Sequence, residues 1–185
     1  VGPRAGHRTA ELQYQTTENY RLTFVGNGNG TYNVKVEAFG YTDIAPDGSH
    51  WYRGITDIAD IDLGDSYDTL TLDMTQAGND ALASPITIYG GDGDDRIIVK
   101  ETPGAPDKNR VIVQGGNGSD FIQAGTGANQ VYGDAGNDFL IQGAIQDANG
   151  TGGTAFFESL DDIQSVFFTG ATNGATLRGG DGNDL

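Results

Sequence analysis

A nine-residue unit occurs three times in succession between residues 115 and 141. The unit follows the pattern G-G-x-G-x-D-x-U-x, where x is any residue and U is a large aliphatic residue. The third copy has Asp134 in place of the second glycine, and the middle copy has Ala124 in place of the first glycine and Asn129 in place of the aspartate. Two further copies begin at Gly90 and Gly179. Repetition at a fixed short period is typical of chains whose units stack on one another, so this feature restricts the fold more than any other.

The residue types within the unit predict a tight turn followed by a short strand. Glycine at the first, second and fourth positions permits positive φ angles and close stacking of successive turns. The aliphatic residue at the eighth position can point into a core while its two neighbours point outward. These core candidates are Ile97, Ile122, Val131 and Leu140. We therefore expect an all-β fold, a parallel β-roll or β-solenoid of stacked short strands, in which two units make one coil with a strand on each face.

Stacking of the coils also brings carboxylates together. The sixth-position residues of alternate units meet, so Asp120 is expected to lie against Asp138. Facing carboxylates repel each other, and a hard divalent cation with about six to eight oxygen ligands removes this repulsion; a flexible set of carboxylates and carbonyls suits calcium better than magnesium. For a single aspartate in a turn, hydrogen bonds to its local backbone are the better explanation, but its recurrence in register favours the cation.

The five copies resemble the RTX, or haemolysin-type, calcium-binding repeats. The resemblance extends over residues 64–185, and it implies several Ca²⁺ ions bound between stacked turns by sixth-position side chains and turn carbonyls. The metal-binding residues that it implies are Gly90, Asp92, Asp95, Gly115, Asn117, Asp120, Gly133, Ala135, Asp138, Thr126, Asn129, Asp147, Gly179, Asp181 and Asp184. It also implies type I secretion from a Gram-negative bacterium to the outside of the cell.

Carried over by position, the resemblance implies two edges with different affinities. It pairs Asp95 with Asp120, and Asp120 with Asp138, along one edge. Along the other edge it pairs Asn129 with Asp147. Because Asn129 is neutral, the second edge is expected to bind calcium more weakly or not at all.

Three acidic residues stand apart from these pairs. Asp184 would serve a further coil, either missing here or supplied by another chain, and we expect the chain to be a piece of a longer protein. Asp92 and Asp94 either add useful charge to one calcium-binding loop or are solvated acids.

The repeats occupy only part of the chain. Residues 1–57 carry none of them and predict an antiparallel β segment, in which strands over residues 20–25 and 31–39 flank a turn of glycine and asparagine. Residues 58–185 are expected to form the roll, with insertions at 101–110 and 151–170. One column of turns is expected at Gly64, Gly90, Gly115 and Gly133. The aromatic residues at 51–52 are expected in the core between the two parts, or alternatively on a surface that stacks on sugars.

The second insertion carries a helical pattern. Its apolar residues at helical spacing are Phe156, Leu160, Ile163 and Phe167. They predict a short amphipathic helix within residues 154–169 that begins with Ser159 as its N-cap. Phe121 and Phe139 recur one coil apart at the outward seventh position and are expected to form an exposed apolar stripe. The insertion is expected to cover this stripe; alternatively, the stripe binds another molecule.

Composition excludes several classes of function. The formal charge of −16 disfavours nucleic acid as a partner, because phosphates would be repelled. The chain has no cysteine, so disulfides and thiolate metal sites are not available, and it has no apolar run long enough for a membrane span. Its two histidines, His7 and His50, do not form the H-E-x-x-H zinc motif, and the G-x-S-x-G nucleophile motif does not occur. The chain is therefore not expected to be an enzyme.

These observations favour a calcium-binding module of a larger secreted bacterial protein, located outside the cell. High charge and low hydrophobicity predict a disordered chain without calcium, since little apolar burial opposes a large entropy cost. Two alternatives remain open. One is an adhesive or surface-layer segment that self-associates or binds carbohydrate, and the other is a non-catalytic fragment of a secreted lipase, protease or epimerase.

Overall fold

The computed structural model describes residues 17–58, 60–78, 84–101, 111–125, 129–142, 144–146, 167–169 and 176–183. The regular elements in these ranges are all β-strands, which confirms the expected all-β class. Within the same ranges there is no helix that could cross a membrane.

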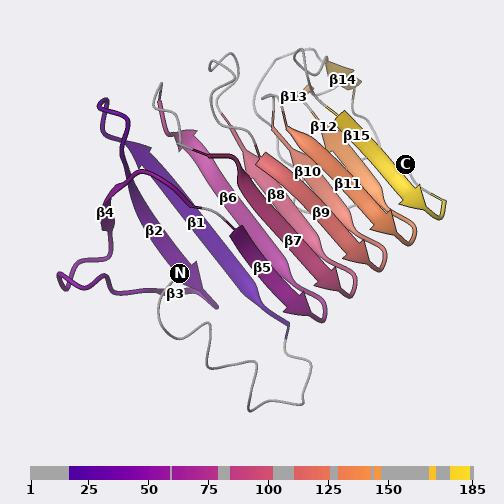
Figure 1. Ribbon diagram of the computed structural model, residues 1–185, viewed down its shortest axis with the longest axis horizontal. Helices are drawn as coiled ribbons and strands as arrows, with labels where there is room; N and C mark the ends of the chain where they lie inside the picture. The colour runs from indigo at the N-terminus through magenta and orange to yellow at the C-terminus, as the bar shows by residue number, and fades with distance from the viewer. Residues whose placement is uncertain are drawn as a thin grey trace.

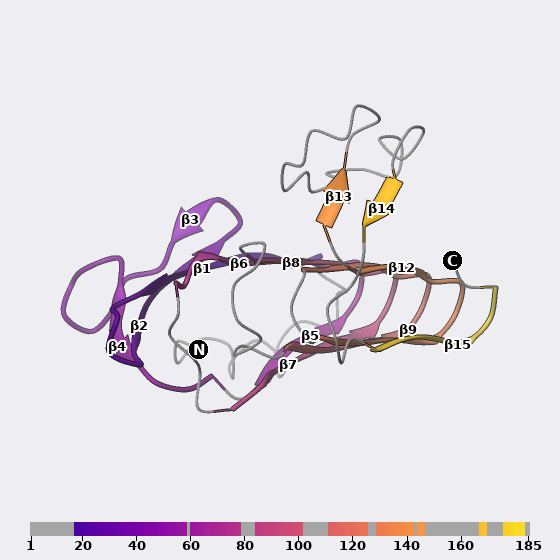
Figure 2. The ribbon, with the colours of Figure 1, turned by 90° about the horizontal axis from the view of Figure 1, so that it is seen from above.

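Two sheets of parallel strands lie face to face (Figures 1 and 2). Sheet B consists, in spatial order, of β15 (Thr176–Asp181), β11 (Gln130–Ala135), β9 (Val111–Asn117), β7 (Ile86–Asp92) and β5 (Asp60–Asp65). Sheet A begins with β12 (Phe139–Gln142), β10 (Phe121–Ala124), β8 (Arg96–Lys100) and β6 (Thr69–Gln76). The chain alternates between the sheets from β5 to β12, so one strand of each sheet makes one coil.

The two edges of the stack are built differently. On the first edge, short turns lead from sheet B to sheet A, as in the passage from β7 to β8. On the second edge the chain returns to sheet B through connections of very different length, which are residues 77–85, 101–110, 125–129 and 143–175. The long connections therefore all join the ends of strands on the second edge.

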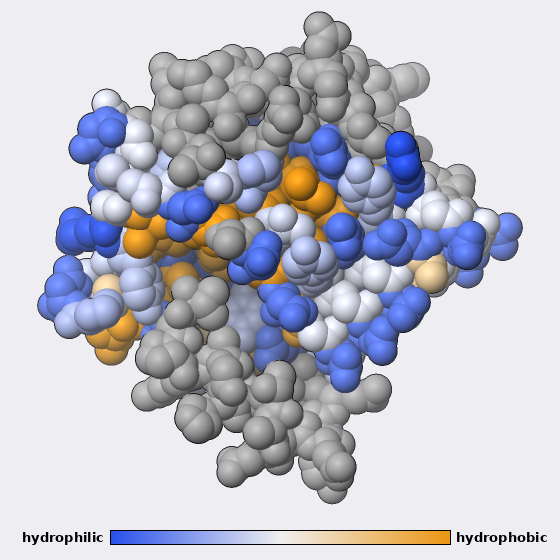
Figure 3. Space-filling model, viewed as in Figure 1, coloured by the Kyte–Doolittle hydropathy of each residue, from blue (hydrophilic) through white to orange (hydrophobic). Residues whose placement is uncertain are grey.

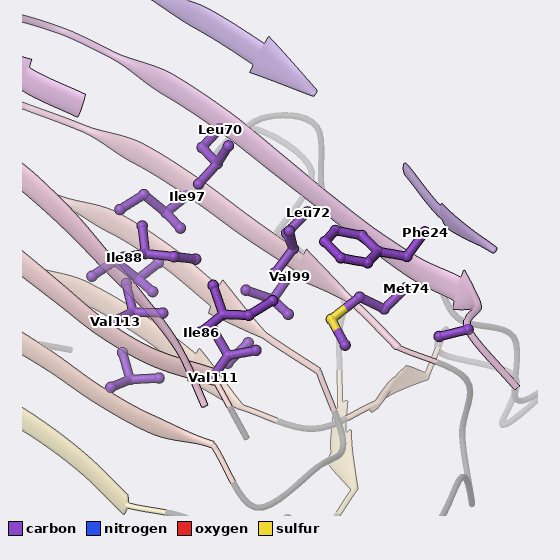
Figure 4. Close-up of a cluster of buried hydrophobic side chains, with 14 of the residues drawn as sticks. Phe24, Leu70, Leu72, Met74, Ile86, Ile88, Ile97, Val99, Val111 and Val113 are labelled. Carbon is purple, nitrogen blue, oxygen red and sulfur yellow. The ribbon is translucent and has the colours of Figure 1, made fainter. Parts of the chain in front are cut away.

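The core lies between the sheets (Figure 4). The eighth-position residues face inward as the pattern predicts: Ile97, Ile122 and Val131 are fully buried, and Leu140 packs against the same cluster. Equivalent residues stack across the strands, as in the series Leu70, Ile97, Ile122 and Leu140. Each fully buried aliphatic side chain contributes roughly 1.5–3 kcal/mol to the stability of the fold.

An antiparallel hairpin closes the N-terminal end of the stack. Sheet A continues from β6 into β1 (Asn19–Gly26), β2 (Tyr32–Ala38) and β3 (Tyr41–Thr42), and β4 (Tyr52–Ile55) pairs with β2. The predicted pairing of β1 with β2 is confirmed, in a register from Tyr20 opposite Ala38 to Gly26 opposite Tyr32. In Figure 2, β2 and β4 lie at the N-terminal end of the two layers.

The sequence did not indicate how this hairpin joins the repeats. Strand β1 pairs in parallel with β6, with Leu22 opposite Leu72, so the hairpin extends sheet A. Its Phe24 and Tyr32 are completely buried, and their rings meet edge to face at a centroid distance of 5.9 Å. Tyr52 of β4 packs against the same core cluster, as expected for the aromatic residues that follow the hairpin.

A partly buried ion pair also links the hairpin to the first coil. The Nη2 atom of Arg21 lies 2.8 Å from the Oδ2 atom of Asp73 on β6. The Oδ1 atom of the same carboxylate accepts a hydrogen bond from the Thr75 hydroxyl at 2.7 Å. Asp73 is only 9% exposed, so the pair fixes β1 against β6 in one position.

Two expectations about the apolar stripe and the insertion need correction. Phe121 and Phe139 do stack, with ring centroids 5.7 Å apart and planes at 6°, and the Arg96 guanidinium lies over Phe121. Phe121 is nevertheless only 7% exposed, so the expected exposure of the stripe is wrong at this residue. The predicted helix is wrong at its C-terminal end, because β14 (Phe167–Thr169) is a strand that pairs with β13 (Ala144–Gln146). The rest of that helix, from residue 154 to 166, lies outside the described residues, so covering of the stripe stays a prediction.

Candidate metal centre

Five turns stack in one column along the first edge. They are turn 1 (residues 63–68), turn 2 (residues 90–95), turn 3 (residues 115–120), turn 4 (residues 133–138) and turn 5 (residues 179–184, described to 183). The turns form the lower right margin of the molecule in Figure 1, and this margin is mostly hydrophilic in Figure 3. The predicted column is confirmed in its order, but Gly64 lies opposite Gly91, so the first position of turn 1 is Leu63.

The glycine at the fourth position of each repeat allows this close stacking. Gly118 and Gly136 adopt φ angles of +140° and +146°, which side chains with a Cβ atom rarely adopt. A Cβ atom added at Gly118 would overlap the carbonyl oxygen of Gly93, and one at Gly136 would overlap that of Gly118. The turns therefore touch through their backbones, and no larger residue fits between them.

The sixth-position aspartates form a ladder along the column. Asp95, Asp120 and Asp138 each accept, through Oδ1, a hydrogen bond from the backbone N–H of the aspartate in the preceding turn. The bonds are Asp68 N to Asp95 Oδ1 at 2.9 Å, Asp95 N to Asp120 Oδ1 at 2.8 Å, and Asp120 N to Asp138 Oδ1 at 2.9 Å. All four side chains are at most 2% exposed. The expected meetings of Asp95 with Asp120 and of Asp120 with Asp138 are therefore present in the structure.

The second carboxylate oxygens are what a cation requires. The Oδ2 atoms of Asp95 and Asp120 are buried and have no hydrogen-bond partner in the part of the chain that the structure describes. A Cβ atom added at Gly90 would overlap both Asp95 Oδ2 and the carbonyl oxygen of Gly115. The same space recurs at Gly115 and Gly133, where the overlapping oxygens are those of the same turn's aspartate and of the next turn's first residue. The first glycine of a turn has no side chain and so makes room for these oxygens, and we call this place a seat.

Electrostatics show that the seats are unfavourable for unpaired negative charge. Burial raises the pKa of Asp120 to about 7, and the neighbouring Asp95 and Asp138 carboxylates add to this rise. Burial likewise raises the pKa of Asp95 to about 6, with the Asp68 and Asp94 carboxylates acting in the same direction. A bound cation would reverse both effects, because it stabilises the charged carboxylates.

The donor set of a seat fits calcium. It consists of carboxylate and carbonyl oxygens, which are the ligands of hard cations, and calcium accepts such sets with flexible geometry. No three acidic or imidazole side chains converge within the described ranges, so a cation there would need backbone carbonyls as well. Each seat would hold its own calcium ion. The oxygens that would bind it are Asp95 Oδ2 with the Gly115 carbonyl, Asp120 Oδ2 with the Gly133 carbonyl, and Asp138 Oδ2 with the Gly179 carbonyl.

The third-position residues lie in the column but use their carbonyls differently. These residues are Asp92, Asn117, Ala135 and Asp181. Their carbonyl oxygens accept hydrogen bonds from the fourth-position N–H groups of the preceding turn, at 2.6–2.8 Å. The side chains of Asp92 and Asn117 are exposed and bond to each other at 2.7 Å. Asp94 is also exposed, and its Oδ1 accepts a hydrogen bond from Ser119 N at 2.7 Å.

On the second edge, a hydrogen bond joins the side chains of Asn129 and Glu101. Asn129 is fully buried, accepts a hydrogen bond from Val111 N at 3.0 Å and donates one to Glu101 Oε2 at 3.0 Å. Glu101 was not predicted, because it is the first residue of an insertion and belongs to no repeat. Asp68 was also missed as a member of the ladder, although the sequence around it reads as a degenerate repeat. The remaining predicted residues, Thr126, Asp147 and Asp184, lie outside the described residues.

Comparison with known proteins agrees with this geometry. Residues 87–99 and 112–141 match the RTX calcium-binding nonapeptide repeat, in four copies. No curated protein and no solved structure matches the chain. Repeats of this kind are structural and bind several Ca²⁺ ions. The chain therefore contains RTX calcium-binding nonapeptide repeats in the residues that form turns 2, 3 and 4.

Proposed function

We propose that this chain is a calcium-dependent β-roll module of a larger bacterial protein, which is secreted and folds when it meets calcium outside the cell. The observation that carries this proposal is the recurrent seat, in which the buried Oδ2 atoms of Asp95 and Asp120 face carbonyl oxygens of the next turn. Proteins with such repeats are typically secreted by bacteria. The role of the module is structural, and any catalytic activity would belong to other parts of the larger protein.

The balance of free energies supports a folding switch. Without calcium, folding must bury several carboxylates in a chain of net charge −16. At calcium concentrations of about 10 to 100 times the dissociation constant, each site adds roughly 1–3 kcal/mol of stability by mass action. A few sites together are comparable to the ~5–15 kcal/mol that stabilises an ordinary domain. Calcium can therefore decide whether the repeats are folded.

The side chains of the column supply the means of this coupling. Calcium, when bound, supplies the positive charge that offsets the buried carboxylates. Asp120 contributes Oδ2 to one seat, while its Oδ1 and backbone N–H join the turns before and after it. Each turn is therefore held by the ladder to both of its neighbours, and order in one seat favours order in the next.

Calcium titration of the chelator-treated protein tests the proposal. We expect circular dichroism to change from disordered chain to β structure with calcium and not with magnesium, and calorimetry to report several ions per chain. Asp120→Asn is expected to lose at least one ion, because it removes the charge from a buried ligand. Asp94→Asn is the matched control and should bind as many ions as the native chain, because Asp94 is exposed. A chelated protein that is already folded and that calcium does not change would contradict the proposal.

A partly exposed row of side chains on sheet B supports a second candidate, carbohydrate binding. Tyr89, Gln114, Tyr132 and Arg178 lie side by side on four adjacent strands. Tyr89 is 38% exposed, and the Arg178 guanidinium lies 5.9 Å from the centre of the Tyr132 ring. Aromatic rings with amide neighbours on a flat face suit stacking on sugars. Binding to a glycan panel that is lost in Tyr89→Ala, with calcium binding unchanged, would support this candidate; a panel without binders would exclude it.

A further inference from the structure

We infer that turn 1 holds no calcium, because Leu63 fills its seat. The N-terminal hairpin and the first coil therefore fold without calcium and serve as a template for the other coils. The inference rests on the proposed calcium-dependent folding of the repeats. It concerns strands β1, β2, β5 and β6, which lie outside the residues matched by the repeat family. We call these four strands the N-terminal unit.

The position of Leu63 follows from the register of sheet B. Asp62 lies opposite Tyr89 and Gly64 lies opposite Gly91, so Leu63 stands where turn 2 has Gly90. At Gly90 a Cβ atom would overlap the oxygens that line the seat. Leu63 has that Cβ atom, and its side chain is only 5% exposed and belongs to the hydrophobic core. In turn 1, the side chain of Leu63 therefore stands where glycine makes room for oxygens in turns 2, 3 and 4.

Asp68 remains in turn 1 as part of the ladder. It is completely buried, its Oδ1 accepts a hydrogen bond from the backbone N–H of Glu18, and its own N–H donates to Asp95. Its Oδ2 atom is buried without a hydrogen-bond partner among the described residues, as in turns 2 and 3, but the first position of turn 1 is Leu63 instead of glycine. Asp68 thus connects the N-terminal hairpin to turn 2 through hydrogen bonds alone.

The N-terminal unit has an apolar core of its own. Its completely buried side chains include Phe24, Tyr32, Leu70 and Leu72. Further along the stack two of the inward series become smaller, whereas the series Leu70, Ile97, Ile122 and Leu140 keeps its size. In sheet A, Leu72 is followed by Val99 in the next coil, and Ala124 occupies the equivalent place in the coil after that. In sheet B, Ile88 is followed by Val113 and Val131.

The stack divides into two parts that differ in their core and in their turns. The N-terminal unit completely buries the rings of Phe24 and Tyr32, and burial of a side chain of this kind contributes roughly 1.5–3 kcal/mol. The later coils are the ones that contain the seats at Gly90, Gly115 and Gly133. Strands β5 and β6 present edges to which β7 and β8 pair in parallel. The N-terminal unit therefore offers a preformed surface on which calcium adds the remaining coils in order.

Hydrogen–deuterium exchange of the full chain, in chelator and in calcium at neutral pH, tests the inference. We expect the amides of β1, β2 and β6 to be protected in both conditions, and those of β10, β11 and β12 to be protected only in calcium. If all strands lose protection together in chelator, the template is wrong although calcium-dependent folding stands. If all strands stay protected in chelator, the proposed function itself fails.

A pair of matched variants tests the closed seat separately. Asp68→Asn keeps the Oδ1 acceptor and is expected to leave the number of bound calcium ions per chain unchanged, as counted by native mass spectrometry. Asp120→Asn, the same change in an open seat, is expected to lower that number. Loss of one ion from Asp68→Asn would overturn the assignment of turn 1 as a turn without calcium.

Discussion

Acid is expected to fold the calcium-free protein. The pKa of Asp120 is raised to about 7 and that of Asp95 to about 6, both from a usual value of 3.8, so the folded state binds more protons than the unfolded chain between about pH 4 and pH 7. The resulting stabilisation is complete below about pH 4 and is lost as the pH rises through 6 and 7. One pKa unit corresponds to about 1.4 kcal/mol, so the shift of Asp120 alone is worth on the order of 4 kcal/mol. Protons thus replace calcium at the buried carboxylates.

Far-ultraviolet circular dichroism of calcium-stripped protein between about pH 4 and pH 8 measures this effect. The β signal should be strongest near pH 4–5 and should fall toward neutrality, whereas in saturating calcium the dependence should reverse, because protons then compete with the cation. Asp120→Asn should show a weaker pH dependence in chelator. A calcium-free protein whose stability rises between pH 5 and pH 7 would show that these carboxylates are not buried as described.

Gly118→Ala is expected to destabilise the calcium-loaded protein by roughly 2–6 kcal/mol. The φ angle of +140° is unfavourable for alanine and costs about 1–3 kcal/mol. In addition, the new methyl group would overlap the backbone carbonyl of Gly93, so two turns must separate, and forced overpacking of this kind costs about 1–3 kcal/mol more. The separation would also disturb the ladder bond between Asp95 and Asp120.

Gly28→Ala provides the matched control in the hairpin turn. Gly28 has a φ angle of +75°, but no atom lies within 4 Å of an added Cβ. Its replacement should therefore cost only about 1–2 kcal/mol, the penalty of the left-handed conformation. Urea unfolding of both variants in saturating calcium gives the comparison. Equal losses would show that φ strain alone, and not the contact between turns, requires glycine in the column.

The nine-residue period was sufficient to predict the repeats, because it fixes several structural features at once. A constant spacing from glycine to aspartate to aliphatic residue places Asp120 beside Asp138 and Ile122 beside Leu140 whatever the rest of the chain does. The eighth-position residues consequently form the core, and the sixth-position residues form the ladder. The same argument predicted the column of turns.

Contacts outside the period could not be predicted in this way. The parallel pairing of β1 with β6 joins residues about fifty positions apart, and alternation of apolar residues specifies a strand but not its partner. The register of turn 1 was misplaced by one residue, because Gly64 resembles the first glycine of a repeat and occupies the second position. The hydrogen bond between Asn129 and Glu101 could not be predicted, because the separation of these residues in the sequence does not follow the repeat.

The unequal edges of the stack determine where this architecture can accept new sequence. A single inserted residue on the first edge would shift the ladder and move every later aspartate out of line with its neighbours, so evolution has little freedom there. On the second edge, connections as different as residues 125–129 and residues 143–175 join equivalent strands. Diversification and protein engineering should therefore both act on the second edge, where a grafted loop or domain would leave the calcium-binding turns in register.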